Sequence, residues 1–230
     1  MKSVMFAIPA YRGIQCIPFT HSMEETLVLC EANGWATTML ILEGNCYIQL
    51  ARNDCVDKFM ESDCDSLFFL DDDISWNAED VLKLLNMEDE IVAGIYPYKT
   101  EHDGYPVVIR TDENHYPIVR EDGCIRGYCV PTGFLRIKRS AIKKLMDGYP
   151  DHAYQNLQQN GELSHKVWDL FPQGRCNGRW VGEDFAFCNL WTGIDGDIWI
   201  VPDITLTHHG KHHTMTGNYH EFLKRQPRHE

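Results

Sequence analysis

Short apolar runs alternate with more polar stretches through the first hundred residues. The runs are a few residues long and end at Pro, Gly or Asp, which is typical of buried strands. The stretches between them predict helices, the first ending near Asn33-Gly34 and the last capped by Asn77. This alternation predicts an α/β fold with a mostly parallel central sheet flanked by helices. The predicted strands are 4–8, 37–42, 66–70 and 91–95, and the predicted helices are 21–32, 49–61 and 77–85.

The second half has a different pattern, with short β-like runs separated by Asp, Asn and Gly turns. We expect a smaller antiparallel part here. Residues 148–181 show little periodicity, and a loop of that length is usually a lid or a binding loop. We treat residues 1–230 as a single domain with halves at about 1–100 and 101–230. The predicted strands are 106–110, 116–120, 125–130, 134–137, 198–201 and 204–207, and the predicted helices are 139–146, 182–191 and 219–224.

The amino-acid composition disfavours some classes of binding partner. The chain has 21 Lys and Arg against 34 Asp and Glu, a net charge of −13, which disfavours nonspecific binding to nucleic acid or an anionic membrane. No apolar stretch is long enough to span a bilayer, and the N-terminus lacks the long apolar region of a secretory signal. The nine Cys are scattered without a C-x-x-C pair, which favours a reducing, cytoplasmic compartment.

Three consecutive carboxylates, Asp71-Asp72-Asp73, follow the apolar run that ends at Leu70. Adjacent carboxylates repel one another, so folding alone gives no reason for them. Mg²⁺ and Mn²⁺ prefer oxygen ligands and bridge carboxylates to phosphates. Ligands of open α/β sheets bind beyond the carboxyl ends of the strands, where this cluster is expected to lie. The alternative is a solvated turn or helix cap, where Asp is also common.

Two further motifs carry charge at predicted helix starts. Arg52 lies near the start of the helix before the Asp cluster and could contact a phosphate or pair with that cluster. Glu183 and Asp184 open an apolar helix. Acidic residues there favour the helix dipole, which is the ordinary explanation, but a carboxylate near an acceptor hydroxyl can also act as a general base.

Four His lie within six residues at 208–213. A zinc site made of His alone is one reading, with His208 and His212 one turn apart if the segment is helical. A strand leads into the segment and Gly210 breaks a helix, so we prefer one His as a ligand of the cation held by the Asp cluster. Gly210 and Lys211 are then close enough to contact a diphosphate. The roles of His209, His212 and His213 stay open.

These motifs, in this order, resemble the GT-A glycosyltransferases, in particular the small family-2-like enzymes of bacteria and phages. The resemblance covers most of the chain. It implies a nucleotide-sugar-binding first half and an acceptor-binding second half. It rests on Ile8-Pro9-Ala10-Tyr11-Arg12-Gly13, Ala51-Arg52-Asn53, Phe69-Leu70-Asp71-Asp72-Asp73-Ile74, residues 92–99, Val130-Pro131-Thr132-Gly133-Phe134, residues 182–188 and Leu206-Thr207-His208-His209-Gly210.

The resemblance also implies roles for individual residues. Asp73 and His208 would bind Mn²⁺ or Mg²⁺, with Asp71 contributing to the metal and to the ribose side of the donor. Asp184 would be the catalytic base, and Glu183 would orient the sugar or the acceptor. The other implied contacts to donor, sugar or acceptor are Pro9, Ala10, Tyr11, Arg52, Asp72, Lys99 and Gly133.

The expected activity is transfer of a hexosyl or pentosyl group from a nucleoside-diphosphate sugar to an acceptor hydroxyl, with inversion favoured. A divalent cation and Lys211 would stabilise charge on the leaving diphosphate. A nucleotidyltransferase, a nucleotide-sugar hydrolase and a noncatalytic binding module stay open. The aromatic residues Trp168, Phe171, Trp180 and Trp191 could be core or sugar-stacking surfaces.

The acceptor is a saccharide, a protein or a hydroxymethylated DNA base. Net charge disfavours DNA, but a local basic segment keeps it open, with a solvated helix face as the alternative. The protein is expected in the cytoplasm of a bacterium or a phage-infected cell. The basic residues are Arg136, Lys138, Arg139, Lys143 and Lys144.

Overall fold

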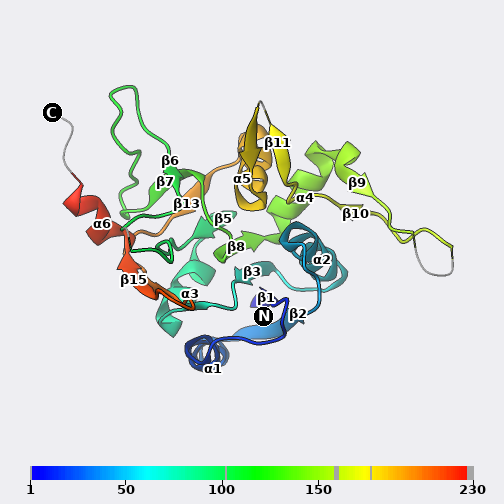
Figure 1. The fold of residues 1–230 in the computed structure, drawn as a ribbon, viewed down its shortest axis with the longest axis horizontal. Coiled ribbons are helices and arrows are strands. Elements are labelled where there is room, and N and C mark those ends of the chain that lie inside the picture. Colours follow the sequence, from blue (N-terminus) through cyan, green and yellow to red (C-terminus); the bar gives the residue numbers. More distant parts are fainter. Residues whose placement is uncertain (1, 102, 158–160, 177, 227–230) are drawn as a thin grey trace.

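The computed structural model describes residues 2–101, 103–157, 161–176 and 178–226. Its centre is an eight-stranded sheet with the order β2-β1-β3-β8-β5-β13-β7-β6, seen with its flanking helices in Figure 1. The strands are β1 (Lys2–Pro9), β2 (Trp35–Leu42), β3 (Ser66–Leu70), β5 (Ile91–Ala93), β6 (Val108–Ile109), β7 (Ile125–Cys129), β8 (Phe134–Lys138) and β13 (Ile198–Ile200).

The sheet is mixed. Strand β1 pairs in parallel with β2 and β3, and β5 pairs in parallel with β13, whereas β8 runs antiparallel between β3 and β5. Strand β7 is antiparallel to both β13 and β6, so β7 and β8 alone oppose the common direction of the other strands of this sheet. The α/β class predicted from the sequence is confirmed. Because β8 is reversed, its first residues lie at the edge where β1, β3 and β5 end.

Helices cover both faces of the sheet, and the alternation of side chains along β3 explains why. Phe68 and Leu70 pack on the face covered by α1 and α3, while Leu67 and Phe69 pack on the face covered by α2, α4 and α5. Both faces of β3 are therefore buried, which fits its uninterrupted apolar run. The helices are α1 (Ile17–Ala32), α2 (Ile48–Glu61), α3 (Ala78–Asn86), α4 (Arg139–Gly148), α5 (Glu183–Gly193) and α6 (Tyr219–Arg225).

A three-stranded sheet, β15-β14-β4, lies beside the main one. It consists of β4 (Ile74–Ser75), β14 (Thr205–His208) and β15 (Met215–Asn218). In the antiparallel pairing of β14 with β4, His208 lies opposite Ile74. This pairing brings the His-rich segment next to the Asp cluster.

Some elements differ from the predictions. Helix α1 begins at Ile17 rather than at residue 21, because Pro18 in its first turn needs no N–H partner. Residues 116–120 contribute two isolated bridges, Thr111 to Pro117 and Val119 to Ile125, instead of a strand.

The stretch 148–181 is not one featureless loop. It contains the short 3-10 helix η1 (Pro150–His152), the pair β9 (Ala153–Tyr154) and β10 (Val167–Trp168), and the hairpin β11 (Gly174–Cys176) with β12 (Arg179–Val181). Both pairs project from the body of the protein in Figure 1. Residues 158–160 and 177 of this predicted loop lie outside the described residues.

The basic segment that was kept open as a DNA-binding patch does not form one continuous surface, because Arg136 is buried and Arg139 is partly buried, although Lys143 and Lys144 are exposed. Arg136 is fully buried and donates to the carbonyl oxygens of Leu84 and Met87 at the end of α3. Arg139 donates in the same way to Phe59 at the end of α2. Both guanidinium groups donate to carbonyl groups in the last turn of a helix, where the regular ladder of intrahelical hydrogen bonds ends. The nearby Lys138 and Lys144 form ion pairs with Glu88 and Glu90.

No helix of the described residues is long and apolar enough to cross a membrane. All nine cysteines are free thiols.

Candidate active site

The carboxyl ends of β1, β3 and β5 meet at one edge of the sheet, and the candidate residues gather there. Pro9 ends β1 and the Asp cluster follows β3. A hollow of about 340 Å³ opens at this edge. It is lined by Pro9, Ile48, Arg52, Asp71, Asp72, Asp73, Lys99, Glu183 and His208.

Asp73 and His208 face each other across part of this hollow. Nε2 of His208 lies 3.4 Å from Oδ1 of Asp73. The other ring nitrogen, Nδ1, lies 2.8 Å from the carbonyl oxygen of Pro97, which can only accept a hydrogen bond. The Nδ1 proton is therefore fixed on that side, and in the neutral ring Nε2 presents a lone pair to the carboxylate.

Lys99 forms an ion pair with Asp73 in the same hollow. Burial acts to raise the pKa of Asp73, but the interactions with His208 and Lys99 outweigh it and leave that pKa below its usual value. Gly210 lies against Lys99, and a Cβ there would come within 2.4 Å of the carbonyl oxygen of His213. Gly210 thus allows a close approach that no other residue would.

Asp71 is oriented differently. Its Oδ1 accepts a hydrogen bond from Arg52 at 2.9 Å, and its Oδ2 accepts one from the hydroxyl of Tyr96 at 3.2 Å. Gly133 packs against this carboxylate, and a Cβ at Gly133 would lie 2.2 Å from Oδ2. Asp71 lines the same hollow as Asp73 and His208 but has a hydrogen bond on each of its oxygens, and its role as a metal ligand stays a prediction.

Arg52 is almost fully buried, yet two of its nitrogens lack hydrogen-bond partners among the described residues. Nη1 is without any partner, and Nε lies 3.5 Å from Glu183, near enough for an ion pair but too poorly aligned for a hydrogen bond. Burial acts to lower the pKa of Arg52, but Asp71 and Glu183 outweigh it, so the pKa is raised and the group stays charged. A buried cation with free donors beside a hollow is suited to binding an anion.

Two further carboxyl groups titrate near neutrality. Burial, then the neighbouring Asp73 and Asp71, raises the pKa of Asp72 to about 6. Burial, then Glu183, raises the pKa of Asp184 to about 6. Perturbed carboxyl groups of this kind are typical of catalytic sites.

Some predicted site residues lie away from the hollow. Ala10 is fully buried, whereas Tyr11 and Lys211 are exposed. Asp184 follows the lining residue Glu183 but is not itself part of the lining. Lys99, rather than Lys211, is the lysine inside the hollow.

Sequence reasoning missed Tyr96 and Ile48. Tyr96 is buried, binds Asp71 and packs edge-on against the ring of His208 at 4.8 Å. The position of Tyr96 just beyond β5 is the signal that could have found it, since strand ends carry ligand contacts.

A larger hollow of about 580 Å³ lies between α1 and α3. Its charged lining residues are Glu24, Glu25 and Glu79, so its lining carries no cationic side chain for binding a phosphate. The smaller hollow is therefore the candidate active site.

No protein-family model matches the chain, and no curated protein matches it. Among solved structures, A197 from STIV is similar at 21% sequence identity, with 92% of this chain and 87% of that chain covered and a TM-score of 0.54. This similarity indicates a shared fold and nothing about activity.

Two further solved structures are similar at lower scores. One is a glycosyltransferase involved in the glycosylation of the major capsid of PBCV-1, at 10% identity over 65% of this chain and 66% of that one, with a TM-score of 0.38. The other is 4-diphosphocytidyl-2C-methyl-D-erythritolsynthase from Anaerococcus prevotii DSM 20548, at 10% identity over 69% and 80%, with a TM-score of 0.37. Both scores are too low to carry an argument.

Proposed function

We propose that this protein is a metal-dependent glycosyltransferase that moves a sugar from a nucleoside-diphosphate sugar to an acceptor hydroxyl. The observation that carries the proposal is the pair Asp73 and His208, whose ligand atoms lie 3.4 Å apart beside a lysine and a buried arginine. The site belongs to a single domain in which the second half supplies the acceptor side.

The residues present fit a divalent cation. A carboxylate oxygen and a neutral imidazole nitrogen at this separation repel unless a cation or a proton lies between them. The hydrogen bond from Nδ1 of His208 to Pro97 is the second contact that metal-binding histidines usually make. Mn²⁺ accepts both oxygen and imidazole ligands, and Mg²⁺ is the harder alternative.

The donor's diphosphate would lie in the hollow. Lys99 offers a flexible point charge, and Arg52 offers fixed donors that no described residue satisfies. A bound divalent cation would supply Lewis-acid stabilisation of the charge on the leaving diphosphate.

Asp184 is the general base of this proposal. Its pKa of about 6 leaves it ionised at neutral pH and still basic enough to take a proton from an acceptor hydroxyl. Glu183, which Arg52 contacts, would orient the sugar or the acceptor. Attack from the face opposite the diphosphate would invert the anomeric centre.

Thermal unfolding with a panel of sugar nucleotides tests the proposal. A matching donor is expected to raise the melting temperature only when Mn²⁺ or Mg²⁺ is present, since a ligand stabilises the folded state by mass action. His208→Ala should abolish this rise. His212→Ala, which changes an exposed residue of the same segment, is the control and should preserve it. A rise of equal size in the His208→Ala protein would reject the site.

Activity assays with the same donor distinguish the other candidate functions. A hydrolase would release free sugar from the donor without an acceptor, and a nucleotidyltransferase would instead form the nucleotide sugar from a nucleoside triphosphate. Binding with no turnover under any of these conditions would indicate a noncatalytic module.

A further inference from the structure

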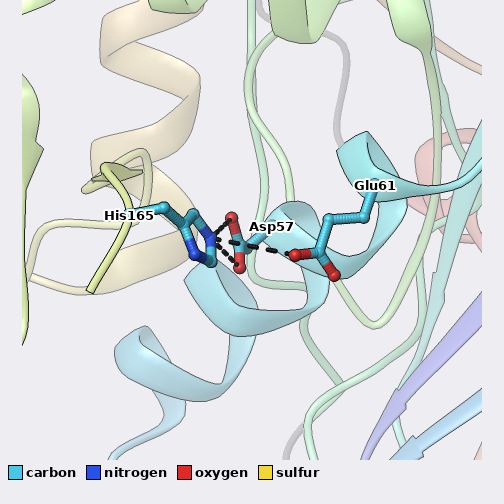
Figure 2. Close-up of side chains that lie close together, drawn as sticks. All are labelled: Asp57, Glu61 and His165. Carbon is cyan, nitrogen blue, oxygen red and sulfur yellow. Dashed lines mark hydrogen bonds and ion pairs between the residues drawn. The ribbon is translucent and has the colours of Figure 1, made fainter. Parts of the chain in front are cut away.

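A second group of metal-ligating side chains lies on the far half of α2, away from the residues that line the candidate active site. Asp57 and Glu61 are four positions apart on this helix and so share one face. His165 comes from the segment that leads into β10. Figure 2 shows the three side chains pointing toward one another.

The distances suit one shared ion. Nε2 of His165 lies 2.9 Å from each oxygen of Asp57 and 3.9 Å from Oε1 of Glu61. One donor atom from each residue falls within 4.8 Å of the others. A tetrahedral Zn²⁺ with bonds of about 2.1 Å holds its donor atoms about 3.4 Å apart, which lies inside the observed range.

The negative charge on this side of α2 also favours binding of a cation. Asp54, Asp57 and Glu61 lie along one side of α2, where like charges three or four positions apart destabilise a helix. Asp54 accepts a hydrogen bond from Asn45, and Lys58 binds Oε2 of Glu61. His165 makes the close side-chain contacts of Asp57 and of Oε1 of Glu61, and the charge of Lys58 acts on both carboxylates. Asp57 is mostly buried, with 16% of its side chain exposed, so its charge is costly unless it is paired.

We propose that Asp57, Glu61 and His165 form a second metal site, matched to Zn²⁺, that fastens the segment before β10 to α2. Zn²⁺ suits a set of one imidazole and two carboxylates, whereas Mg²⁺ and Ca²⁺ prefer oxygen ligands alone. Water completes the coordination, since His165 is half exposed.

The position of the site gives it a structural role. Asn53, on the first half of α2, already holds the chain beyond β10, because its side chain bonds to Asp169, Leu170 and Phe171. A bound metal would attach the chain to α2 at a second point, His165, just before β10. Helix α2 also carries Arg52 of the candidate active site, so the two ends of this helix would be ordered together. This inference does not depend on the proposed transferase activity.

Zinc titration of chelator-treated protein, followed by calorimetry and with Co²⁺ absorption as an independent probe, tests the site. The His165→Gln and Glu61→Gln proteins should each take up one fewer equivalent of Zn²⁺ than the wild type, or bind that equivalent at least tenfold more weakly. His21→Gln is the matched control, because His21 and Glu24 form an exposed pair with the same 3.9 Å separation but no third ligand within the described part of the chain. It should bind zinc as the wild type does.

Two further measurements distinguish this site from the candidate active site. Asp73→Asn should leave the equivalent that depends on His165 unchanged. Zinc should slow amide hydrogen exchange at residues 161–168 in the wild type and have no such effect in His165→Gln. Identical zinc stoichiometry and affinity in the wild type and His165→Gln would overturn the proposal and leave His165 as a simple ion-pair partner of Asp57.

Discussion

His208 presents Nε2 to the carboxylate of Asp73 while its Nδ1 is held by the backbone carbonyl of Pro97. Strand β14 puts the imidazole there by pairing with β4, the two-residue strand directly after the Asp cluster. The backbone N–H of His209 donates to the carbonyl oxygen of Asp73 at 2.7 Å, which adds a second link between the two segments. Backbone pairing therefore holds the two residues side by side, as the proposed metal site requires.

Replacing Asp73 by Asn tests whether binding of the sugar-nucleotide donor depends on a metal ion at this carboxylate. The variant keeps the size of the side chain but removes the charge, so Mn²⁺-dependent binding of the sugar nucleotide should weaken by at least the roughly 10- to 100-fold that loss of a hydrogen-bond partner of a metal ligand costs. Titration calorimetry with and without Mn²⁺ measures this. Asp203→Asn removes an exposed carboxylate that pairs with Lys83, and it should leave donor binding intact. Equal losses in the two variants would point to general destabilisation.

Replacing Asp184 by Asn should reduce transfer by about 10²- to 10⁴-fold and leave donor binding unchanged, since general-base catalysis contributes about that much. In the wild type, kcat/KM should fall as the pH drops below about 6, because the carboxyl group must be ionised to accept a proton. The pH profile of kcat/KM for the slower Asp184→Asn enzyme should lack this fall. Retention of both the rate and the fall in the variant would assign the base elsewhere.

The raised pKa of Asp184 also predicts that ionisation of this carboxyl group lowers the stability of the folded protein. Its pKa in the folded protein lies above the value of about 3.9 expected in the unfolded chain, so ionisation favours unfolding. The penalty is absent below about pH 4, grows between about pH 4 and 6, and is complete above that range. Asp184→Asn should therefore be more stable than the wild type at pH 8, by at most about 3 kcal/mol. The two proteins should be nearly equal at pH 4. Urea unfolding at the two pH values measures the difference.

The order of the helices and strands could be predicted from the sequence, but only part of the candidate active site could. The apolar run 66–70 and the acidic residues after it were sufficient to put Asp73 at a strand end, since strand length and edge chemistry are local properties. Residue chemistry predicted only that one His shares a cation with the Asp cluster, and the resemblance to GT-A glycosyltransferases implied that the two ligands are Asp73 and His208. The pairing of β14 with β4 that brings them together depends on tertiary structure.

Arg136 and Arg139 illustrate what local pattern cannot supply. Each belongs to a basic segment in the sequence, yet each binds carbonyl oxygens at the end of a helix distant in sequence. Likewise, the i, i+4 spacing of Asp57 and Glu61 was visible, but nothing local brings His165 to them. Long-range contacts of this kind leave no periodic signal.

Gly133 is predicted to be irreplaceable for packing at the site. An added methyl group would lie 2.2 Å from Oδ2 of Asp71 and 2.7 Å from the hydroxyl of the buried Tyr96. Gly133→Ala should lower stability by about 1–3 kcal/mol through overpacking and weaken donor binding as Asp71 is displaced from Arg52. At Gly104 the nearest atom to an added Cβ is a Tyr98 ring carbon at 3.4 Å, an ordinary contact. Gly104→Ala should therefore be close to neutral in the same denaturation and titration measurements.

Trp180 is predicted to contact the acceptor. It is 69% exposed on β12, the strand that leads through Gly182 into Glu183 and Asp184, and it lies opposite Arg175 in the hairpin. An exposed indole three residues before the lining carboxylate Glu183 offers an apolar face on which a sugar or a base ring can stack. Trp180→Ala should raise the KM for the acceptor about 3- to 10-fold, while donor affinity and melting temperature stay unchanged because the side chain is not part of the core. Tyr116→Ala, which removes an aromatic ring of similar exposure from another part of the surface, should change neither KM. Steady-state kinetics with donor and acceptor varied separately measures both values, and an unchanged acceptor KM in Trp180→Ala would exclude the hairpin from acceptor recognition.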